Sequence, residues 1–297
     1  MNGIRRLFVG ARGLRGGWRF LFFVLLAIGG GGLLQLVLVT VVGYRPPPGF
    51  GAFDLGLADG LGLAVALLVA AILNPFDEHP FGAYGLPPGG RLVPRFVEGA
   101  AWGGAAVGLL MTLIWAAGGV SFGGLALHGP ALAQAAIAWA VTMIVLGLYE
   151  EFLFRGYALV ALWDGLGFWP AAIVLSALFG ALHYFTKPME TWVDFATVAL
   201  IGLFLAYTFF RTGSLWFAVG FHAAFDYAAL VVFGGPNSGN QGKPLDDRLL
   251  ATTFHGPAWL TGGPLGPEAS FFAFLVVAGL FAAFVWRSRR FTERPPA

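Results

Sequence analysis

Long apolar segments recur along the chain and constrain its fold more than any other feature. A helix needs about 20 apolar residues to cross the hydrocarbon core of a bilayer. The segments are continuous and do not alternate with polar residues, which predicts an all-α, polytopic helical integral membrane protein rather than a barrel. We expect about eight transmembrane helices, at approximately 20–43, 57–74, 96–118, 131–162, 168–186, 192–210, 214–234 and 268–287.

The composition agrees with this class. The 297 residues are 58% hydrophobic and 11% charged, whereas soluble domains are about one-quarter charged. Cysteine is absent, which excludes disulfides and thiolate metal ligands. The net charge of +2 is small and gives no reason to expect nucleic acid as a partner. The lipid bilayer is the expected surrounding.

Arginines at both ends of the chain predict its orientation. Cytoplasmic segments of membrane proteins are enriched in Lys and Arg, so both termini are expected in the cytoplasm and the number of spans is even. The predicted organisation is a basic tail at 1–19, a transmembrane domain at 20–287 and a basic tail at 288–297, in the inner (plasma) membrane of a bacterial cell. The loop at 75–95 then lies inside, and the loops at 119–130 and 235–267 lie outside. We expect 235–267, which is rich in Gly and Pro, to be an irregular loop with a short interfacial helix. The arginines are Arg5, Arg6, Arg12, Arg15, Arg19, Arg287, Arg289, Arg290 and Arg294.

A small set of ionisable residues lies within the predicted helices. Such a group at the bilayer centre costs at least ~2.5–3.5 kcal/mol, so it is a candidate functional residue. We expect Asp59 and Glu98, nearer segment ends, to reach the headgroups, and Asp194 to be interfacial. The remaining candidates are Glu150, Glu151, Arg155, His183, His222 and Asp226.

The spacing of these residues relates them in pairs. Glu151 and Arg155 are four residues apart, so they share a helix face and can form an ion pair. Adjacent helical residues point about 100° apart, so Glu150 and Glu151 cannot face one cavity in the same way. We predict that Arg155 holds Glu151 and leaves Glu150 free for chemistry. The same spacing of four joins Phe179 to His183 and His222 to Asp226.

Depth can be compared by counting residues from predicted turns. Glu150 and His183 lie on either side of a turn at 163–167, each ~20–25 Å from it. His222 lies only ~12 Å beyond the turn at 211–214. Tilt, side-chain reach and a cavity must cover this remaining offset.

A carboxylate beside two imidazoles can activate water. The carboxylate acts as a general base, one imidazole orients the water, and the other donates a hydrogen bond to a developing oxyanion. Glutamate and histidine are also zinc ligands, although the HExxH motif is absent. Two possibilities stay open: a site without a cofactor, which we favour, or one zinc ion held by Glu150, His183 and His222.

Three motifs in order lead to a family resemblance. "EEFLFR" at 150–155 matches EExxxR, "FGALH" at 179–183 matches FxxxH, and "HAAFD" at 222–226 matches HxxxN/D. On successive membrane helices these motifs resemble those of the type II CAAX prenyl endopeptidases and their bacterial relatives, the CPBP or Abi family. The resemblance covers about residues 131–234 and implies an intramembrane endopeptidase.

The resemblance also implies roles for the motif residues. In the family, the first glutamate activates water, the histidine of the second motif positions it, and the last histidine with its Asn/Asp partner stabilises the oxyanion. Many relatives have Asn where this chain has Asp226, which donates to an oxyanion only if protonated and can otherwise orient His222. The catalytic roles fall on Glu150, His183, His222 and Asp226, and the supporting roles on Glu151, Arg155 and Phe179.

The expected substrate is a hydrophobic or lipidated peptide or a membrane protein. Two other classes remain as alternatives. Intramembrane Glu, Arg and His also occur in proton-coupled carriers, although the chain shows no inverted repeat and no matching pair of broken helices. A non-catalytic immunity or scaffold protein of the same fold is the other, and a paired His222–Asp226 contact inside the bundle would then be purely structural.

Overall fold

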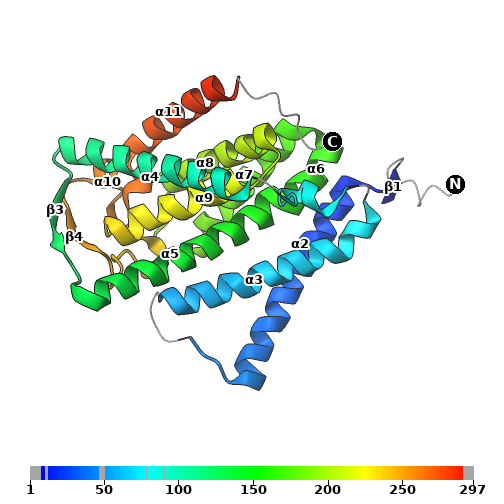
Figure 1. Cartoon of the computed structure of the whole chain (residues 1–297), viewed down its shortest axis with the longest axis horizontal. Coiled ribbons are helices and arrows are strands. Elements are labelled where there is room, and N and C mark those ends of the chain that lie inside the picture. Colours follow the sequence, from blue (N-terminus) through cyan, green and yellow to red (C-terminus); the bar gives the residue numbers. More distant parts are fainter. Residues whose placement is uncertain (1–7, 11–12, 47–50, 78, 90, 290–297) are drawn as a thin grey trace.

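The computed structural model describes residues 8–10, 13–46, 51–77, 79–89 and 91–289, and it is a bundle of helices (Figure 1). Each of the eight predicted segments is helical. Seven helical stretches of the described chain are long and apolar enough to cross a membrane: Gly16–Val42, Ala52–Phe76, Leu92–Ala116, Gly129–Leu166, Phe168–Thr186, Trp192–Thr212 and Phe271–Ser288. The segment predicted at 214–234 forms a shorter apolar helix, Trp216–Val232. The prediction of a polytopic, all-α membrane protein is confirmed.

The individual elements follow one another with short connections. The long helices are α2 (Gly16–Val37), α3 (Ala52–Leu73), α4 (Leu92–Ala116), α5 (Gly129–Glu151), α7 (Phe168–Thr186), α8 (Trp192–Thr212) and α11 (Phe271–Ser288). The shorter ones are α6 (Ala158–Leu166), α9 (Trp216–Asp226) and α10 (Ala258–Thr261). Segments of π-helix follow α2, α5 and α9, at Leu38–Val42, Phe152–Tyr157 and Tyr227–Val232. The strands are β1 (Val9–Gly10), β2 (Gly13–Leu14), β3 (Val120–Leu125) and β4 (Leu250–Phe254).

Helix α9 lies inside the bundle, between α4 and α5 (Figure 1). Glycines allow this position because they let backbones approach closely. A Cβ atom on Gly99 or Gly103 of α4 would lie 2.0 or 2.2 Å from a carbonyl oxygen of α9. A Cβ atom on Gly220 of α9 would lie 2.1 Å from a carbonyl oxygen of α4. On the opposite side, Gly147 of α5 faces α9 at 3.2 Å. The position of α9 is therefore fixed from two sides.

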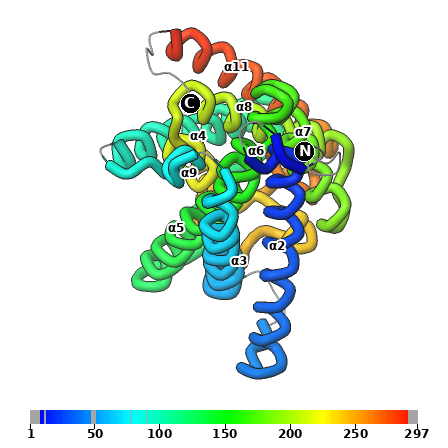
Figure 2. Tube along the Cα trace, turned by 90° about the vertical axis from the view of Figure 1, so that its right-hand side faces the viewer, coloured from blue at the N-terminus to red at the C-terminus, as the bar shows by residue number. Residues whose placement is uncertain are grey.

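Helices α2 and α3 form the periphery. Helix α2 packs against α3 and α6 near its start, and its later part extends away from the bundle (Figure 2). Apolar side chains of that part, among them Ile28, Leu33 and Val41, are exposed. In a membrane protein such a surface contacts lipid rather than water.

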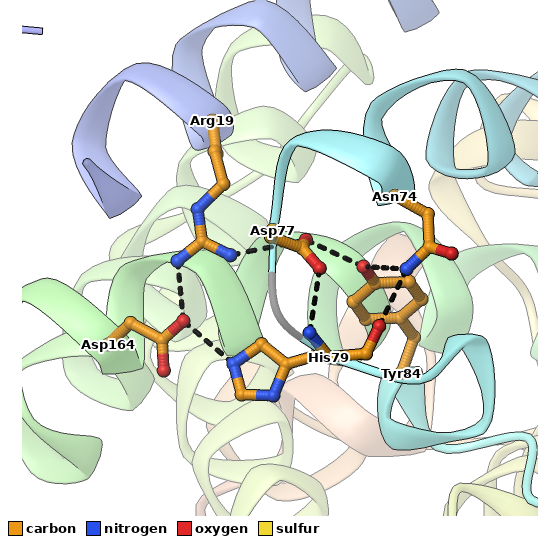
Figure 3. Close-up of polar contacts among 6 residues, drawn as sticks. All are labelled: Arg19, Asn74, Asp77, His79, Tyr84 and Asp164. Atoms are coloured by element: carbon orange, nitrogen blue, oxygen red, sulfur yellow. Dashed lines mark hydrogen bonds and ion pairs between the residues drawn. The ribbon is translucent and has the colours of Figure 1, made fainter. Parts of the chain in front are cut away.

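A polar cluster joins three segments at one end of the bundle (Figure 3). Arg19 of α2 binds Asp77 at 3.1 Å and Asp164 of α6 at 2.5 Å. His79 binds Asp164 at 2.8 Å, and the Tyr84 hydroxyl donates to Asp77 at 2.6 Å. We call Arg19, Asn74, Asp77, His79, Tyr84 and Asp164 the Arg19 cluster.

The Arg19 cluster brings together three segments that the orientation argument placed on the same side. These are the start of the first span, the loop at 75–95 and the turn at 163–167. The end of α11 lies beside the start of α4, where Arg287 binds Glu98 at 2.6 Å. Glu98, expected among headgroups, is thus paired with an arginine. Arg5, Arg6, Arg12, Arg290 and Arg294 lie outside the described residues.

The two loops predicted on the other side pair with each other. Strands β3 and β4 are antiparallel, with Val120 opposite Phe254. The segment at 235–267 was expected to be irregular, so the strand β4 corrects that expectation. The pairing joins residues more than 120 positions apart through backbone hydrogen bonds, which neither segment shows in its own side-chain pattern. The turn at 163–167 is also shorter than expected, because α6 continues to Leu166 and only Gly167, with φ of 81°, interrupts the helix.

Candidate active site

Two helices end at the candidate site, and both continue as π-helix. Glu150 and Glu151 are the last residues of α5, and the π-helical segment Phe152–Tyr157 follows them. Asp226 is the last residue of α9 and precedes the second such segment, Tyr227–Val232. Insertions of π-helix into α-helices occur frequently at functional sites, because they turn side chains away from the regular helical positions. At Gly156 the backbone leaves the helical region altogether, with φ −81° and ψ −115°.

Glu151 is the buried centre of the site. Its side chain is fully buried, and Oε1 accepts a hydrogen bond from Nη1 of Arg155 at 2.9 Å. The pairing predicted from the spacing of four residues is therefore present. The same Oε1 lies 2.9 Å from Nδ1 of His222, a contact that the sequence did not predict. Glu151 thus links α5 to α9 and fixes the imidazole as well as the guanidinium.

Arg155 is held by more than its ion pair. Its side chain is 2% exposed, and its guanidinium carbon lies 4.5 Å from the centre of the Phe179 ring. A cation over an aromatic face is attracted by the ring's negative face. Gly202 of α8 leaves the space for Nη2, since a Cβ atom there would lie 2.4 Å from it. Phe179 also contacts the ring of His183, with centroids 4.6 Å apart, so it supports both residues.

His222 contacts three carboxylates. Besides Glu151, its Nε2 lies 3.6 Å from Oε2 of Glu150 and 3.4 Å from Oδ2 of Asp226. Both distances exceed the 2.7–3.2 Å of a usual N–H···O hydrogen bond. Nδ1 of His222 is therefore hydrogen-bonded to Glu151, whereas Nε2 has no contact of usual hydrogen-bond length. Nε2 can bind a water or a substrate atom instead.

The expected depth offset between Glu150 and His222 is absent. The start of α9 is anchored inside the end of the bundle, because the backbone N–H of Leu215 donates to the carbonyl of Gly85 at 2.9 Å. A Cβ atom on Gly147 would lie 3.5 Å from the Cβ of His222, so α5 and α9 approach closely one turn before Glu150 and Glu151. Counting residues from the two turns therefore overestimated the separation of Glu150 and His222, whose side chains lie 3.6 Å apart.

His183 approaches the same region from α7. Its Nδ1 lies 3.0 Å from the carbonyl oxygen of Phe179. Because a carbonyl only accepts, Nδ1 carries the proton and Nε2 of the neutral ring is an acceptor. Within the described chain no ion pair joins His183 to Glu150, but both residues line one cavity. The ring is thus prepared to accept a hydrogen bond from a water.

The cavity has a volume of about 180 Å³ and is lined by both apolar and polar side chains. Glu150, His222 and Asp226 remain partly accessible, with side chains 24%, 12% and 20% exposed. All four residues predicted to be catalytic line this cavity. Its other polar residues are Asp59, Lys187, Asn237, Ser238 and Glu268.

The expectation that Asp59 reaches the headgroups was wrong. Asp59 lines the cavity, and its Oδ2 is buried without a hydrogen-bond partner in the described structure. The reason is that α3 begins at Ala52 rather than at about 57, so Asp59 lies two turns inside the helix. Asp194, expected at the interface, is 2% exposed. The turn at Pro267–Ala269 packs against its helix α8.

Three polar cavity residues come from the segment after α9 and were not candidates. Asn237 and Ser238 belong to the loop at 235–267 that was expected to be irregular, and Glu268 is the first residue of the span predicted at 268–287. Burial, with the Asp226 carboxylate nearby, raises the pKa of Glu268 to about 7. No motif marked these residues, because only the folding of the connection over the helix ends brings them to the cavity.

The donor set does not fit the zinc alternative. A catalytic zinc ion needs three protein ligands that converge at about 2.0–2.2 Å from the metal. Across the described ranges, no group of three or more His, Cys, Asp or Glu side chains is arranged to hold a metal ion.

Fold and site together define a polytopic helical membrane protein with a carboxylate–imidazole cavity. Residues 130–228 match the family model described as type II CAAX prenyl endopeptidase Rce1-like. The match begins with α5 and ends just after α9, and it includes all three motifs. The predicted resemblance to the type II CAAX prenyl endopeptidases is confirmed for this segment, which covers about a third of the chain. No curated protein and no solved structure matches the chain.

Proposed function

We propose that the protein is an intramembrane endopeptidase that hydrolyses a peptide bond with a water activated by Glu150. The carrying observation is the contact between Glu150 and His222 at 3.6 Å in a cavity that His183 also lines. The two groups are farther apart than a usual hydrogen bond, so each can instead bind a water or a substrate atom in the cavity beside them. The neighbouring Glu151 is buried, and its Oε1 is held at 2.9 Å by both Arg155 and His222.

The reaction follows from these positions. Glu150 takes a proton from a water that His183 orients through its acceptor nitrogen. The resulting hydroxide attacks the carbonyl carbon of the scissile bond, and the negative charge moves to the carbonyl oxygen. His222 donates a hydrogen bond from Nε2 to this oxyanion. Glu150 then returns its proton to the leaving amine as the C–N bond breaks, which restores the site.

Asp226 orients His222 rather than donating to the oxyanion in this mechanism. Its Oδ2 lies 3.4 Å from Nε2 of His222. A carboxylate in contact with an imidazole fixes the orientation of the ring. The Glu151 contact at Nδ1 does the same from the other side.

The cavity lining supports a hydrophobic substrate. Leu55, Met143, Leu146, Phe221 and Leu230 lie beside the polar groups. We propose a hydrophobic or lipidated peptide, or a membrane protein, as the substrate in a bacterial inner membrane, with both termini of the enzyme in the cytoplasm. In such a membrane, maturation of a peptide pheromone or bacteriocin is a more natural reaction than cleavage of a prenylated protein. The proposed mechanism requires no metal.

The first experiment compares wild type with Glu150→Gln, purified in detergent. Each is incubated with a farnesylated CAAX peptide and with a library of hydrophobic peptides, with and without a strong chelator. We expect wild type to cleave and Glu150→Gln to be slower by about 10²–10⁴-fold, with no effect of the chelator. Glu98→Gln is the control, because it removes a carboxylate outside the cavity.

Other results would change the proposal. Activity that is lost with chelator and restored by zinc would require a metalloenzyme instead. If wild type cleaves nothing and Glu150→Gln still rescues a deletion strain, the scaffold alternative replaces the enzyme. Proton-coupled uptake into vesicles would indicate a carrier.

A further inference from the structure

We infer that Asn237 is a further catalytic residue, whose side-chain amide donates a hydrogen bond to the substrate's carbonyl oxygen in the transition state. This inference rests on the proposed function. Asn237 lies outside the matched segment 130–228 and outside all three motifs. It lines the same cavity as Glu150 and His222.

The first argument is the orientation of the Asn237 amide. Its Oδ1 accepts a hydrogen bond from the backbone N–H of Asn240 at 2.9 Å. This bond fixes which end of the amide is oxygen, and it directs Nδ2 away from Asn240. The backbone is fixed as well, because the carbonyl of Asn237 accepts from the N–H of Gly242 at 2.9 Å.

The second argument is an unused donor. Asn237 is 6% exposed, and its buried Nδ2 has no hydrogen-bond partner in the described structure. A buried donor without a partner costs about 1–3 kcal/mol. Folded proteins rarely contain such groups, and those that persist often have a functional reason. A substrate oxygen in the cavity would provide the missing acceptor.

The third argument is that the proposed reaction needs a second hydrogen-bond donor for the oxyanion. Two donors commonly stabilise an oxyanion, and here His222 supplies one. The neighbouring Asp226 does not supply the second, because its carboxylate oxygen lies 3.4 Å from Nε2 of His222 and can only accept. Asn237 brings an amide to the cavity from the connection after α9.

Other cavity residues fit this role less well. Lys187 also lines the cavity, but its side chain is exposed. An exposed ammonium is hydrated and mobile, whereas an oxyanion donor works through fixed position. Asn237 is both buried and held by its loop.

The test is the kinetics of cleavage of the peptide that wild type cuts best in the first experiment. Asn237→Ala removes the donor, and Asn237→Asp removes it while keeping the acceptor for the N–H of Asn240. We expect both to lower kcat by about 10²–10³-fold with little change in KM, since an oxyanion donor acts mainly in the transition state. Asn240→Ala is the matched control, because its side chain bonds the carbonyls of Lys243 and Pro244 within the same loop. We expect it to retain kcat.

A swap variant separates the missing donor from the added charge. Asp226→Asn combined with Asn237→Asp has the net charge of wild type and again places one amide in the cavity. We expect its kcat to exceed that of Asn237→Asp at least tenfold.

The outcomes distinguish this inference from the proposed function. If Glu150→Gln abolishes cleavage while the Asn237 variants keep kcat within about twofold, the inference is wrong and the proposed function stands. A loss in Asn240→Ala equal to that in Asn237→Ala, or a swap no faster than Asn237→Asp, assigns the effect to the loop or the charge and also overturns it. Absence of cleavage by wild type overturns both.

Discussion

The protein has two polar clusters of similar composition and different tightness. The Arg19 cluster and the cavity site each contain a buried arginine, a histidine and at least two carboxylates. In the Arg19 cluster, the carboxylates of Asp77 and Asp164 each accept two or more contacts of 3.1 Å or less. In the site, only Glu151 is bound so closely. Glu150 and Asp226 are 3.6 and 3.4 Å from His222.

The difference in contact distances indicates which cluster stabilises the fold and which can take part in a reaction. Closely satisfied charges stabilise a fold and cannot rearrange without cost, as in the Arg19 cluster. Groups with slack beside a cavity can accept water and substrate, as Glu150 and His222 do in our proposal. The site contains both kinds, since the tight triad of Glu151, Arg155 and His222 supports the loose side of the imidazole. Similar residue types therefore serve different purposes, and the distances decide which.

The largest effect is expected from Arg155→Met. It leaves the fully buried carboxylate of Glu151 without its cation, and breaking a buried pair typically costs about 3–5 kcal/mol. Activity should fall as well, because Arg155 no longer holds Glu151, the residue that binds Nδ1 of His222. Thermal unfolding in detergent and peptide cleavage measure the two effects. The double variant Arg155→Met with Glu151→Gln should regain part of the stability; if it does not, the pair is not the cause.

Arg19→Met tests the other cluster and should affect stability alone. Asp77 keeps its bonds from Tyr84 and from the N–H of His79, so the expected loss is smaller, about 1.5–3 kcal/mol. The kcat per folded molecule should equal that of wild type at a temperature where both are folded. A loss of kcat without a loss of stability would contradict the division between the clusters.

Gly220→Ala probes the frame that holds the site. Its Cβ would meet a carbonyl oxygen of α4 at 2.1 Å, so α9 must shift and move His222. Overpacking of this kind costs about 1–3 kcal/mol. We expect lower stability and lower kcat together. Gly104→Ala on α4 is the control, since a Cβ there has open space, and an equal effect of both variants would argue against the close contact as the cause.

The smallest effect is a pH dependence that involves His79. Its hydrogen bond with Asp164 raises the pKa of His79 above its usual value. The pair therefore contributes its full stability below about pH 6.5, the pKa of an unfolded histidine, and the contribution is lost as pH rises through the folded pKa. We expect a change below about 1 kcal/mol. Thermal unfolding between pH 5.5 and 9 should show it in wild type and not in His79→Gln.

Much of the fold was predictable because the length of an apolar segment decides whether it spans a membrane. The helix predicted at 168–186 has these bounds in the structure, and the one predicted at 96–118 is observed at Leu92–Ala116. The pairing of β3 with β4 was not, since it depends on backbone bonds between distant segments. The start of α3 was also missed, because its first residues include Asp54 and three glycines and reduce the apolar character of the segment.

In the site, the spacing of residues within one helix predicted one contact, and the packing of different helices added others that the sequence did not predict. The Glu151–Arg155 pair follows from helical geometry, so it could be predicted from four residues of separation. The contact of Glu151 with His222 depends on how α5 and α9 cross, which glycines such as Gly147 determine in three dimensions. Asn237 lies at the cavity because a connection of no regular pattern folds back over it. The catalytic roles themselves remain predictions for the experiments above.

The cavity is lined by residues from two parts of the chain, which can change independently as the sequence diverges. Glu150, His183 and His222 lie on helices within the matched domain, whereas Asn237, Ser238 and Glu268 lie on a later connection beyond it. Substitutions, insertions and recombination in 234–270 can therefore alter what enters the cavity while the proposed reaction centre on the helices stays unchanged. Related genes in one genome are then expected to share the helices and differ in this stretch. A library of variants confined to it is the most direct way to select for new substrates.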